Sequence, residues 1–331
     1  KGKVAVTTHD DDFIEKFFVS NTHDTLMFIT NMGQLYWLKV YKIPEGSRTA
    51  KGKAVVNLIN LRPDEKIMAI LPTSDFDESK SLSFFTKNGI VKRTSLVEFS
   101  NIRSNGVRAI VLDDLDEVVT AKITDVESQY IMIFTSLGQC IRFDIDKTRE
   151  QGRSTRGVRG IKFKHDTDFV VDADVIDSEE QELLTMSEKG IGKRTEVSEY
   201  RLTNRAGSGV ISMKLSNKTG NVIGEVLVDD SQDLMALTSI GKMIRVDMQT
   251  IRKAGRNTSG VIIVNVDKGD KVVSIAKCPK QDEEIEVDEN GNVIRYNEEG
   301  EVIEQIEVED NTKTQEPKSL IDNLEEKKED K

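Results

Sequence analysis

Short runs of apolar and β-branched residues, about five residues each, follow one another along most of the chain, separated by turns rich in Gly, Asp and Asn. The clearest example is the run Leu26–Thr30, followed by the turn Asn31–Gly33 and a second run, Leu35–Val40. Two such runs joined by a short turn predict a β-hairpin. No convincing helical pattern occurs, so we expect an all-β fold.

One turn recurs at a nearly constant interval. It contains a glycine, preceded in most copies by an arginine three or four residues earlier, and successive glycines are 50 to 54 residues apart. A period of this length is typical of architectures in which each repeat is one supersecondary unit. The anchor glycines, as we call them, are Gly2, Gly52, Gly106, Gly157, Gly209 and Gly260.

A second signature alternates with the anchors: Thr or Ser, two residues, Gly, then Lys or Arg three to six residues later. Because this signature occurs five times and the anchor six times, we expect the chain to open partway through a repeat whose other half lies upstream. The glycines of the second signature are Gly33, Gly89, Gly138, Gly190 and Gly241.

One repeat is too small to bury both faces of its sheet, and stacking repeats around a closed ring solves this problem. We therefore expect residues 1–278 to form a propeller, with one blade of about four strands per repeat and the first repeat truncated at its N-terminal side. The composition changes after Cys278. Alternating residues around Asn290-Gly291 predict a β-hairpin within an acidic extension, 279–309, and the densely charged segment 310–331 predicts a disordered tail.

The net charge of −11 is unevenly distributed. Residues 279–331 contain 19 acidic and 7 basic residues, so residues 1–278 are almost neutral and their bases gather at the repeated turns. The two cysteines have no CxxC spacing and there are only three histidines, which argues against a disulfide framework or a metal site. No run is apolar enough to span a membrane. We expect a cytoplasmic protein.

Arg or Lys at equivalent positions around a ring would form a curved belt of charge, which matches the phosphate backbone of bent double-stranded DNA. Two sets of bases are candidates, and the sequence leaves open which of them faces the rim. The first set consists of Lys1, Lys3, Arg48, Lys51, Lys53, Arg103, Arg108, Arg149, Arg153, Arg156, Arg159, Arg205, Arg252 and Arg256. The second set consists of Lys92, Arg93, Arg142, Lys193, Arg194 and Arg245.

Few features of the sequence support a catalytic function. The segment Gly190–Thr195 lacks the glycine spacing of a phosphate loop and the Ser or Thr directly after its lysine. Residues 288–292 resemble the start of a calcium loop, but Val293 stands where glycine is required. Aromatic residues make up only 5% of the chain, too few for base-stacking platforms. We expect no catalytic residue, metal or cofactor in this chain.

The stretches NTHDTLMFITNMGQLYWLKVYKIPE, GRSTRGVRGIK, EKGIGKRTEVSEYR and GRNTSGV resemble the repeats of the C-terminal domain of DNA gyrase A, part of a type IIA topoisomerase. The resemblance covers residues 1 to 278. It implies a six-bladed β-pinwheel, a propeller variant whose blades exchange strands, with DNA wrapped around its basic rim. Lys1-Gly2-Lys3 resembles only the end of a Gln, Arg and Gly box that the family needs for the wrap, which puts full supercoiling by this chain in doubt.

The resemblance also implies partners. The chain would be a monomeric domain that works with the rest of gyrase A and with gyrase B in an A2B2 enzyme, where the catalytic tyrosine, ATP and Mg²⁺ are used elsewhere. Two alternatives are the equivalent domain of topoisomerase IV and an interaction propeller of kelch or RCC type, although kelch blades need more Tyr and Trp than this chain has. The acidic tail either competes with DNA for the rim or serves only solubility.

Overall fold

The computed structural model describes residues 20–44, 55–101 and 105–280, together with three short strands farther on, and its chain divides into two units, 1–280 and 281–331. The first unit is built from β-sheets and short 3-10 helices, so the all-β prediction is confirmed. Within the described residues, no helix is long and apolar enough to cross a membrane.

The first blade shows how each sheet is made. β1 (Thr25–Thr30) and β2 (Gln34–Lys39) form the predicted hairpin, and β3 (Ile67–Thr73) pairs antiparallel with the other edge of β1. All six residues of β1 are buried. One face of β1 packs against blade 2 and the other against residues of the segment 40–61. A central strand covered on both faces needs no alternation of polar and apolar residues, and it reads as a continuous apolar run.

Four more blades repeat this arrangement. In each, a hairpin of two strands is followed by a third strand that pairs with the first strand of the hairpin. The strands are β4 (Ser81–Thr86), β5 (Ile90–Ser95) and β7 (Val118–Thr124) in blade 2; β8 (Tyr130–Thr135), β9 (Gln139–Asp144) and β11 (Val170–Ile176) in blade 3; β12 (Glu182–Ser187), β13 (Ile191–Glu196) and β15 (Val222–Val228) in blade 4; and β16 (Gln232–Thr238), β17 (Met243–Asp247) and β19 (Val272–Pro279) in blade 5.

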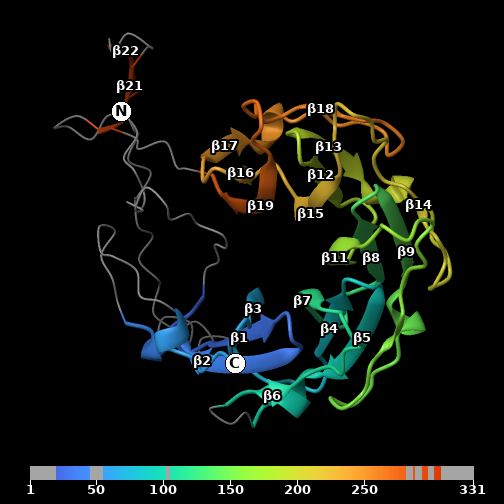
Figure 1. The fold of residues 1–331 in the computed structure, drawn as a ribbon. Coiled ribbons are helices and arrows are strands. Elements are labelled where there is room, and N and C mark those ends of the chain that lie inside the picture. Colours follow the sequence, from blue (N-terminus) through green and yellow to red (C-terminus); the bar gives the residue numbers. More distant parts are fainter. Residues whose placement is uncertain are drawn as a thin grey trace, which may run out of the picture. The chain divides into compact units, whose positions relative to one another are not determined.

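The fourth strand of a blade comes from the repeat that follows it. After the hairpin of one blade, the chain runs back to the preceding blade, adds a two-residue strand to its outer side, and then returns to form its own third strand. These outer strands are β6 (Val107–Arg108) on blade 1, β10 (Val158–Arg159) on blade 2, β14 (Val210–Ile211) on blade 3 and β18 (Val261–Ile262) on blade 4. Figure 1 shows the blades following one another in chain order.

The described residues form five blades, so the prediction of six is wrong for this structure. The reason lies in the strand exchange. A blade is built around a hairpin with Thr or Ser three residues before a glycine, of which the sequence has five, whereas each of the four anchor glycines that the structure describes precedes an outer strand that joins the preceding blade. Counting anchors therefore does not count blades. Blade 5 has three strands in the part of the chain that the structure describes.

Apolar side chains pack mainly between adjacent blades. Met27 of blade 1 and Phe84 of blade 2 belong to one buried cluster, and Phe85 of blade 2 and Ile131 of blade 3 to the next. The third strands, β3, β7, β11, β15 and β19, lie innermost and line a central cavity of about 450 Å³. The blades thus bury each other's faces, as expected for repeats that lack a core of their own.

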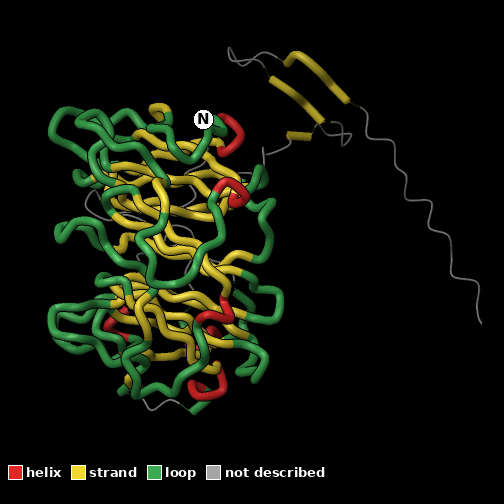
Figure 2. Tube along the Cα trace, turned by 90° about the vertical axis from the view of Figure 1, so that its right-hand side faces the viewer, coloured by secondary structure: helices red, strands yellow, loops and turns green. Residues whose placement is uncertain are grey.

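Each blade has two ends with different loops. The hairpin turns and the turns before the third strands lie at one end, which we call the turn end; for example, Lys66 N donates to the side chain of Asn31. At the other, the crossover end, 3-10 helices follow the hairpins: η1 (Val40–Lys42), η3 (Leu96–Phe99), η4 (Ile145–Lys147), η5 (Val197–Glu199) and η6 (Met248–Thr250). A further 3-10 helix, η2 (Val55–Asn57), precedes β3. Figure 2 shows most 3-10 helices along one side of the strands.

The second unit contains β20 (Glu286–Val287), β21 (Val293–Tyr296) and β22 (Val302–Ile306), which form a three-stranded antiparallel sheet. β20 and β21 flank Asn290-Gly291, where the sequence predicts a hairpin. The boundary between the units falls after Lys280, two residues beyond the predicted position. The predicted tail 310–331 lies outside the described residues.

Candidate nucleic-acid interface

Basic residues gather on the outer edge of the blades, which consists of the outer strands and the loops that lead into them. The loop before β10 and that strand contain four arginines and one glutamate, and the loop before β18 contains two arginines and one lysine. These loops are outermost because the outer strands pair with the outward-facing side of each hairpin. The outer edge is therefore cationic at blades 2 and 4.

The first set of predicted bases lies on this edge wherever the structure describes it. Five side chains are exposed, namely Arg108, Arg149, Arg156, Arg159 and Arg252, while Arg153, Arg205 and Arg256 are half-buried. The half-buried guanidinium groups also contact their own surroundings: Arg205 Nε donates to Lys147 O at 3.2 Å and Arg256 Nη1 to Ile211 O at 2.9 Å. Lys1, Lys3, Arg48, Lys51, Lys53 and Arg103 lie outside the described residues.

Glycine is required at the anchors because the loops pass very close to the blade they join. A Cβ atom at Gly157, where φ is +92°, would lie 2.6 Å from Val91 O, and one at Gly209 would lie 2.1 Å from Cys140 O. Both the positive φ and the missing space favour glycine. Positive φ values also occur at Gly33, Gly89, Gly106, Gly138, Gly190, Gly241 and Gly260, while Gly2 and Gly52 lie outside the described residues.

Arginines of the second set clamp one blade to the next. Arg93 Nη1 of blade 2 donates to Ile145 O at 3.1 Å and to Thr148 O at 3.2 Å, both at η4 of blade 3. Arg142 Nη1 of blade 3 donates in the same way to Tyr200 O beside η5 of blade 4. The side chain of Arg142 is only 2% exposed. These guanidinium groups satisfy the carbonyl groups of Thr148 and Tyr200, which follow a short helix, and add a second donor to Ile145 O.

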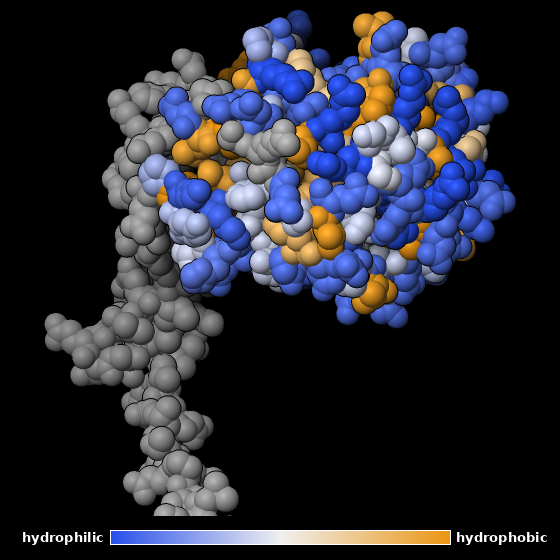
Figure 3. Space-filling model, turned by 90° about the horizontal axis from the view of Figure 1, so that it is seen from below, coloured by the Kyte–Doolittle hydropathy of each residue, from blue (hydrophilic) through white to orange (hydrophobic). Residues whose placement is uncertain are grey.

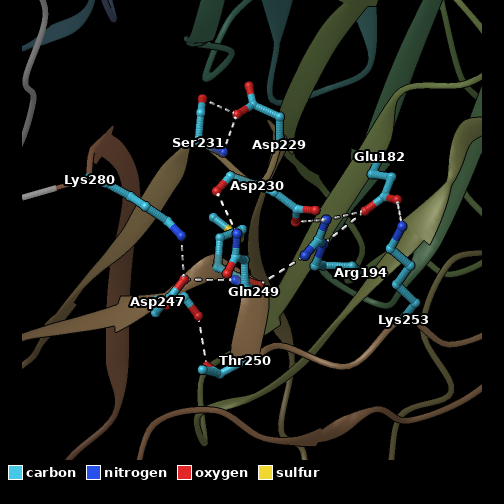
Figure 4. A network of polar contacts seen from close by, with 11 residues as sticks. Glu182, Arg194, Asp229, Asp230, Ser231, Asp247, Gln249, Thr250, Lys253 and Lys280 are labelled. Carbon is cyan, nitrogen blue, oxygen red and sulfur yellow. Dashed lines mark hydrogen bonds and ion pairs between the residues drawn. The ribbon is translucent and has the colours of Figure 1, made fainter. Parts of the chain in front are cut away.

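The next clamp joins blades 4 and 5. Arg194 Nη1 donates to Met248 O at 3.0 Å, and the same guanidinium pairs with Glu182 and Asp230. Lys253 pairs with the other oxygen of Glu182, so four charged side chains form one network (Figure 4).

Two lysines of the second set are fully buried. Lys92 Nζ donates to Ala109 O at 2.7 Å and to Arg153 O at 2.9 Å. Lys193 Nζ donates to the carbonyl groups of residues 255, 256 and 258. Burial lowers the pKa of each lysine to about 8, although nearby carboxylates act in the opposite direction and raise the pKa.

The prediction that the second set contacts DNA is therefore wrong for its buried members. Their donors are used inside the protein, where a phosphate group has no access. Arg245 has its side chain one-third exposed and pairs with Asp233 across its own blade. The repeated Lys-Arg dipeptide is thus a structural signature, which the sequence alone could not distinguish from a surface one. The buried members are Lys92, Arg142, Lys193 and Arg194.

Sequence reasoning missed a further group of bases. Beyond β10 and β14 the chain continues toward the turn end, and its lysines there are exposed. Lys162 and Lys214 share one offset from their anchor glycines, but the other anchors have no base at that offset, and the remaining two lysines share none. The periodic signal at these lysines is therefore weak. They are Lys162, Lys164, Lys214 and Lys218.

The crossover end has the opposite charge close to the central cavity. Four connections lead from the third strand of one blade to the hairpin of the next, and their ten acidic residues are all exposed. Figure 3 shows one side of the molecule, where hydrophilic residues cover most of the surface. Charge is thus segregated, with bases on the outer edge and acids on these inner connections. The acids are Asp75, Asp77, Glu78, Asp125, Glu127, Asp177, Glu179, Glu180, Asp229 and Asp230.

One buried carboxyl group stands apart from the interface. Glu225 of β15 accepts hydrogen bonds from Thr185 Oγ1 at 2.8 Å and Ser212 Oγ at 2.5 Å, and it occupies a position that is apolar in the other four blades. Burial raises its pKa to about 8, although both hydroxyl groups and Lys193 favour the ionised form. No group of three or more potential metal-ligating side chains occurs in the described part of the chain.

Five strand-exchanging blades with a cationic outer edge define a propeller-like repeat domain. The family model described as "DNA gyrase C-terminal domain, beta-propeller" matches the chain at residues 24–74, 80–125, 129–177, 181–224 and 232–279, one segment per blade. The chain belongs to the DNA gyrase C-terminal domain family, which confirms the resemblance seen in its repeats.

Curated relatives agree with this assignment. The chain is 62% identical over 327 residues to DNA gyrase A of Campylobacter jejuni, covering 88% of this chain and 38% of that protein. For DNA gyrase A of Helicobacter pylori strain 26695 the identity is 56% over 284 residues, covering 86% and 34%. The chain thus spans little more than a third of the length of these relatives.

Solved structures show the same fold. The C-terminal domain of DNA topoisomerase IV aligns with a TM-score of 0.74 and 25% identity, covering 83% of this chain and 85% of that one. A DNA gyrase A C-terminal domain aligns with a TM-score of 0.67 and 28% identity, covering 78% and 83%. The topoisomerase IV alternative is not favoured, because the relatives at 55% to 62% identity are DNA gyrase A proteins.

Proposed function

We propose that this domain binds double-stranded DNA without sequence specificity, bends it, and wraps it along the outer edge. The observation that carries the proposal is the repetition of exposed arginines on the outer strands of blades 1 and 2 and in the outer loops of blades 2 and 4. Contacts from arginine to phosphate depend on charge and geometry but not on base sequence. The acidic inner connections would repel the duplex and leave the outer edge as its path.

The charge available is sufficient for bending. Turning 20 to 30 base pairs by 40 to 90° costs about 1 to 6 kcal/mol, which a single phosphate contact does not offset. Six or more phosphate contacts would offset this bending cost. They would also make log K for DNA binding fall with log salt at a slope of roughly −5 to −9. The five exposed arginines and the exposed lysines toward the turn end provide about this number of contacts.

By its relationship to DNA gyrase A proteins, the domain would present the bound DNA to the rest of gyrase A and to gyrase B as the segment to be transported. ATP hydrolysis and strand cleavage would take place elsewhere in an A2B2 enzyme, and the domain would need no cofactor of its own. We propose a cytoplasmic, chromosome-associated location for the complete enzyme.

A salt titration of duplex binding tests the proposal directly. We expect the chain to bind with a slope in the range given above, and a variant with Arg149, Arg156 and Arg159 changed to Ala to lose about 2 to 3 from that slope. Lys80→Ala is the matched control, because this lysine lies on an acidic inner connection and pairs with Asp75. A slope near zero for the unaltered chain would overturn the proposal.

Wrapping needs a topological assay. Relaxed circular DNA is mixed with the chain and a nicking-closing enzyme, and the linking number is then compared with that of DNA without the chain. A wrapping domain shifts the linking number, whereas an interaction propeller leaves it unchanged. Binding without any shift would contradict the wrapping part of the proposal.

A further inference from the structure

Two of the outer loops are fastened to the blade that they join by the same pair of side chains, a buried lysine and an exposed glutamate. Lys92 contacts Arg153 O from inside blade 2, while Glu98 Oε2 accepts from Arg153 N at 3.2 Å. One residue of the loop is therefore bound through both its carbonyl and its amide group. Because Arg153 lies between Arg149 and Arg156, this attachment is at the middle of the basic loop.

Blade 4 repeats the arrangement. Lys193 contacts the carbonyl groups of Gly255, Arg256 and Thr258, and Glu199 Oε2 accepts from Arg256 N at 2.8 Å. Lys92 and Lys193 are each the third residue of their strands, β5 and β13, and both glutamates are the third residue of a 3-10 helix. We call the two sets, Lys92 with Glu98 and Lys193 with Glu199, the Lys–Glu pairs.

Blade 3 lacks both members. The residue equivalent to the lysines is the buried Ile141, and the third residue of η4 is Lys147. Its outer loop is fastened in another way: Arg205 donates its own Nε to Lys147 O and its Nη1 to Arg159 O. In blade 3, the guanidinium group of Arg205, which would otherwise be available to bind phosphate, is used to hold the loop in place.

Blades 1 and 5 also lack the pairs. Blade 1 has Tyr36 and Lys42 at the two positions, and blade 5 has Ile244 and Thr250. Lysine and glutamate thus occur together in two blades and both are absent from three. Because blade 3 folds with an isoleucine at the buried position, a blade does not require the buried ammonium group. Burying it carries a desolvation cost, which points to a role at the loop.

We propose that the Lys–Glu pairs are positioning residues for DNA binding, which fix the outer loops of blades 2 and 4 so that their arginines meet the phosphate backbone in preset places. This inference rests on the proposed function. A loop ordered in advance loses less conformational entropy when DNA binds, so its affinity is higher for the same charges.

The glutamates allow a test in which charge and positioning predict opposite results. Changing Glu98 and Glu199 to Ala removes two negative charges next to the basic loops, so electrostatics alone would tighten DNA binding. Positioning predicts that binding of a duplex by the full 331-residue chain weakens, by about threefold to tenfold at fixed salt. Glu196→Ala is the matched control, since this exposed glutamate at the end of β13 contacts Ser198 and neither outer loop.

Hydrogen exchange provides a second measurement. In Glu98→Ala/Glu199→Ala, and in a separate Lys92→Met/Lys193→Met variant, we expect faster amide exchange in residues 149–157 and 252–260 but unchanged exchange in residues 201–209 of blade 3. If the lysine variant does not fold, the glutamate variant decides alone. Unchanged or tighter binding by the glutamate variant overturns the inference, whereas failure of the unaltered chain to bind DNA overturns the proposed function instead.

Discussion

The inter-blade clamp at Arg142 offers the sharpest test of how adjacent blades are held together. The guanidinium group donates from Nη1 to Val197 O at 3.3 Å and to Tyr200 O at 3.0 Å, pairs with Glu179, and lies 4.0 Å from the centre of the Tyr130 ring. Arg142→Met keeps most of the aliphatic volume but removes all of these polar contacts.

The magnitude follows from burial. Hydrogen bonds to a charged donor contribute about 1.5 to 3 kcal/mol each, and a buried carbonyl left without a donor costs about 1 to 3 kcal/mol. Val197 O keeps the amide of Tyr200 as a donor, so Tyr200 O bears most of the loss. Removing the buried charge returns part of this cost. We expect Arg142→Met to lower the free energy of unfolding by about 3 kcal/mol.

Arg245→Met is the matched control at the equivalent position of blade 5. Its side chain is 33% exposed and pairs with Asp233 of the same blade, so we expect a loss of about 0 to 1 kcal/mol. Urea unfolding followed by circular dichroism measures both variants. A changed slope of the transition would show that blades 3 and 4 had uncoupled. Equal losses for the two arginines would refute the inter-blade role.

Three further predictions concern the outer edge, an anchor glycine and the buried carboxyl group. Arg156→Ala should reduce the salt slope of duplex binding by about 0.9 and leave the free energy of unfolding almost unchanged. An unchanged salt slope would exclude this side chain from the interface. Gly157→Ala should lower the free energy of unfolding by more than about 2 kcal/mol, because the new Cβ would meet Val91 O. Gly241→Ala, where φ is +83° and no atom lies within 4 Å, should lower it by about 1 kcal/mol in the same urea assay. Similar losses for the two variants would contradict the close approach at Gly157. Because the pKa of Glu225 is raised from 4.5 to about 8 in the folded chain, the folded state retains a proton that the unfolded state has lost, and stability falls as pH rises through this window. Glu225→Gln should remove a fall on the order of 4 kcal/mol between these pH values, and an unaltered pH dependence of unfolding would show that another group is responsible.

The anchor glycines illustrate how far sequence reasoning reaches. Their spacing predicts a repeat of about one blade, and the structure shows why glycine is needed at each described copy, since a Cβ at Gly209 would meet the backbone of β9. The spacing does not reveal that the strand after each described anchor joins the preceding blade. Partner choice between strands depends on contacts far apart in the chain, which the local pattern does not encode.

The basic residues show the same limit. Arg156 directly precedes an anchor glycine and Arg194 follows the recurring Gly190 by four residues, yet the first is exposed on the outer edge and the second is buried against η6. A charged residue is exposed by default, and only contacts from another repeat can bury it with its donors satisfied. Nothing in the sequence near Lys92 indicates that its ammonium group contacts Arg153 O, in a loop about 60 residues later in the chain.

Local chemistry in the amino-acid sequence was enough to determine the all-β class, the positions of the hairpins, the repeat length and the family, because turn residues and short apolar runs act over a few neighbouring positions. The tertiary structure alone decided the number of blades, the exchange of outer strands and the division of the bases into exposed and buried sets. Each of these depends on which repeat packs against which, and packing joins residues about 50 positions or more apart.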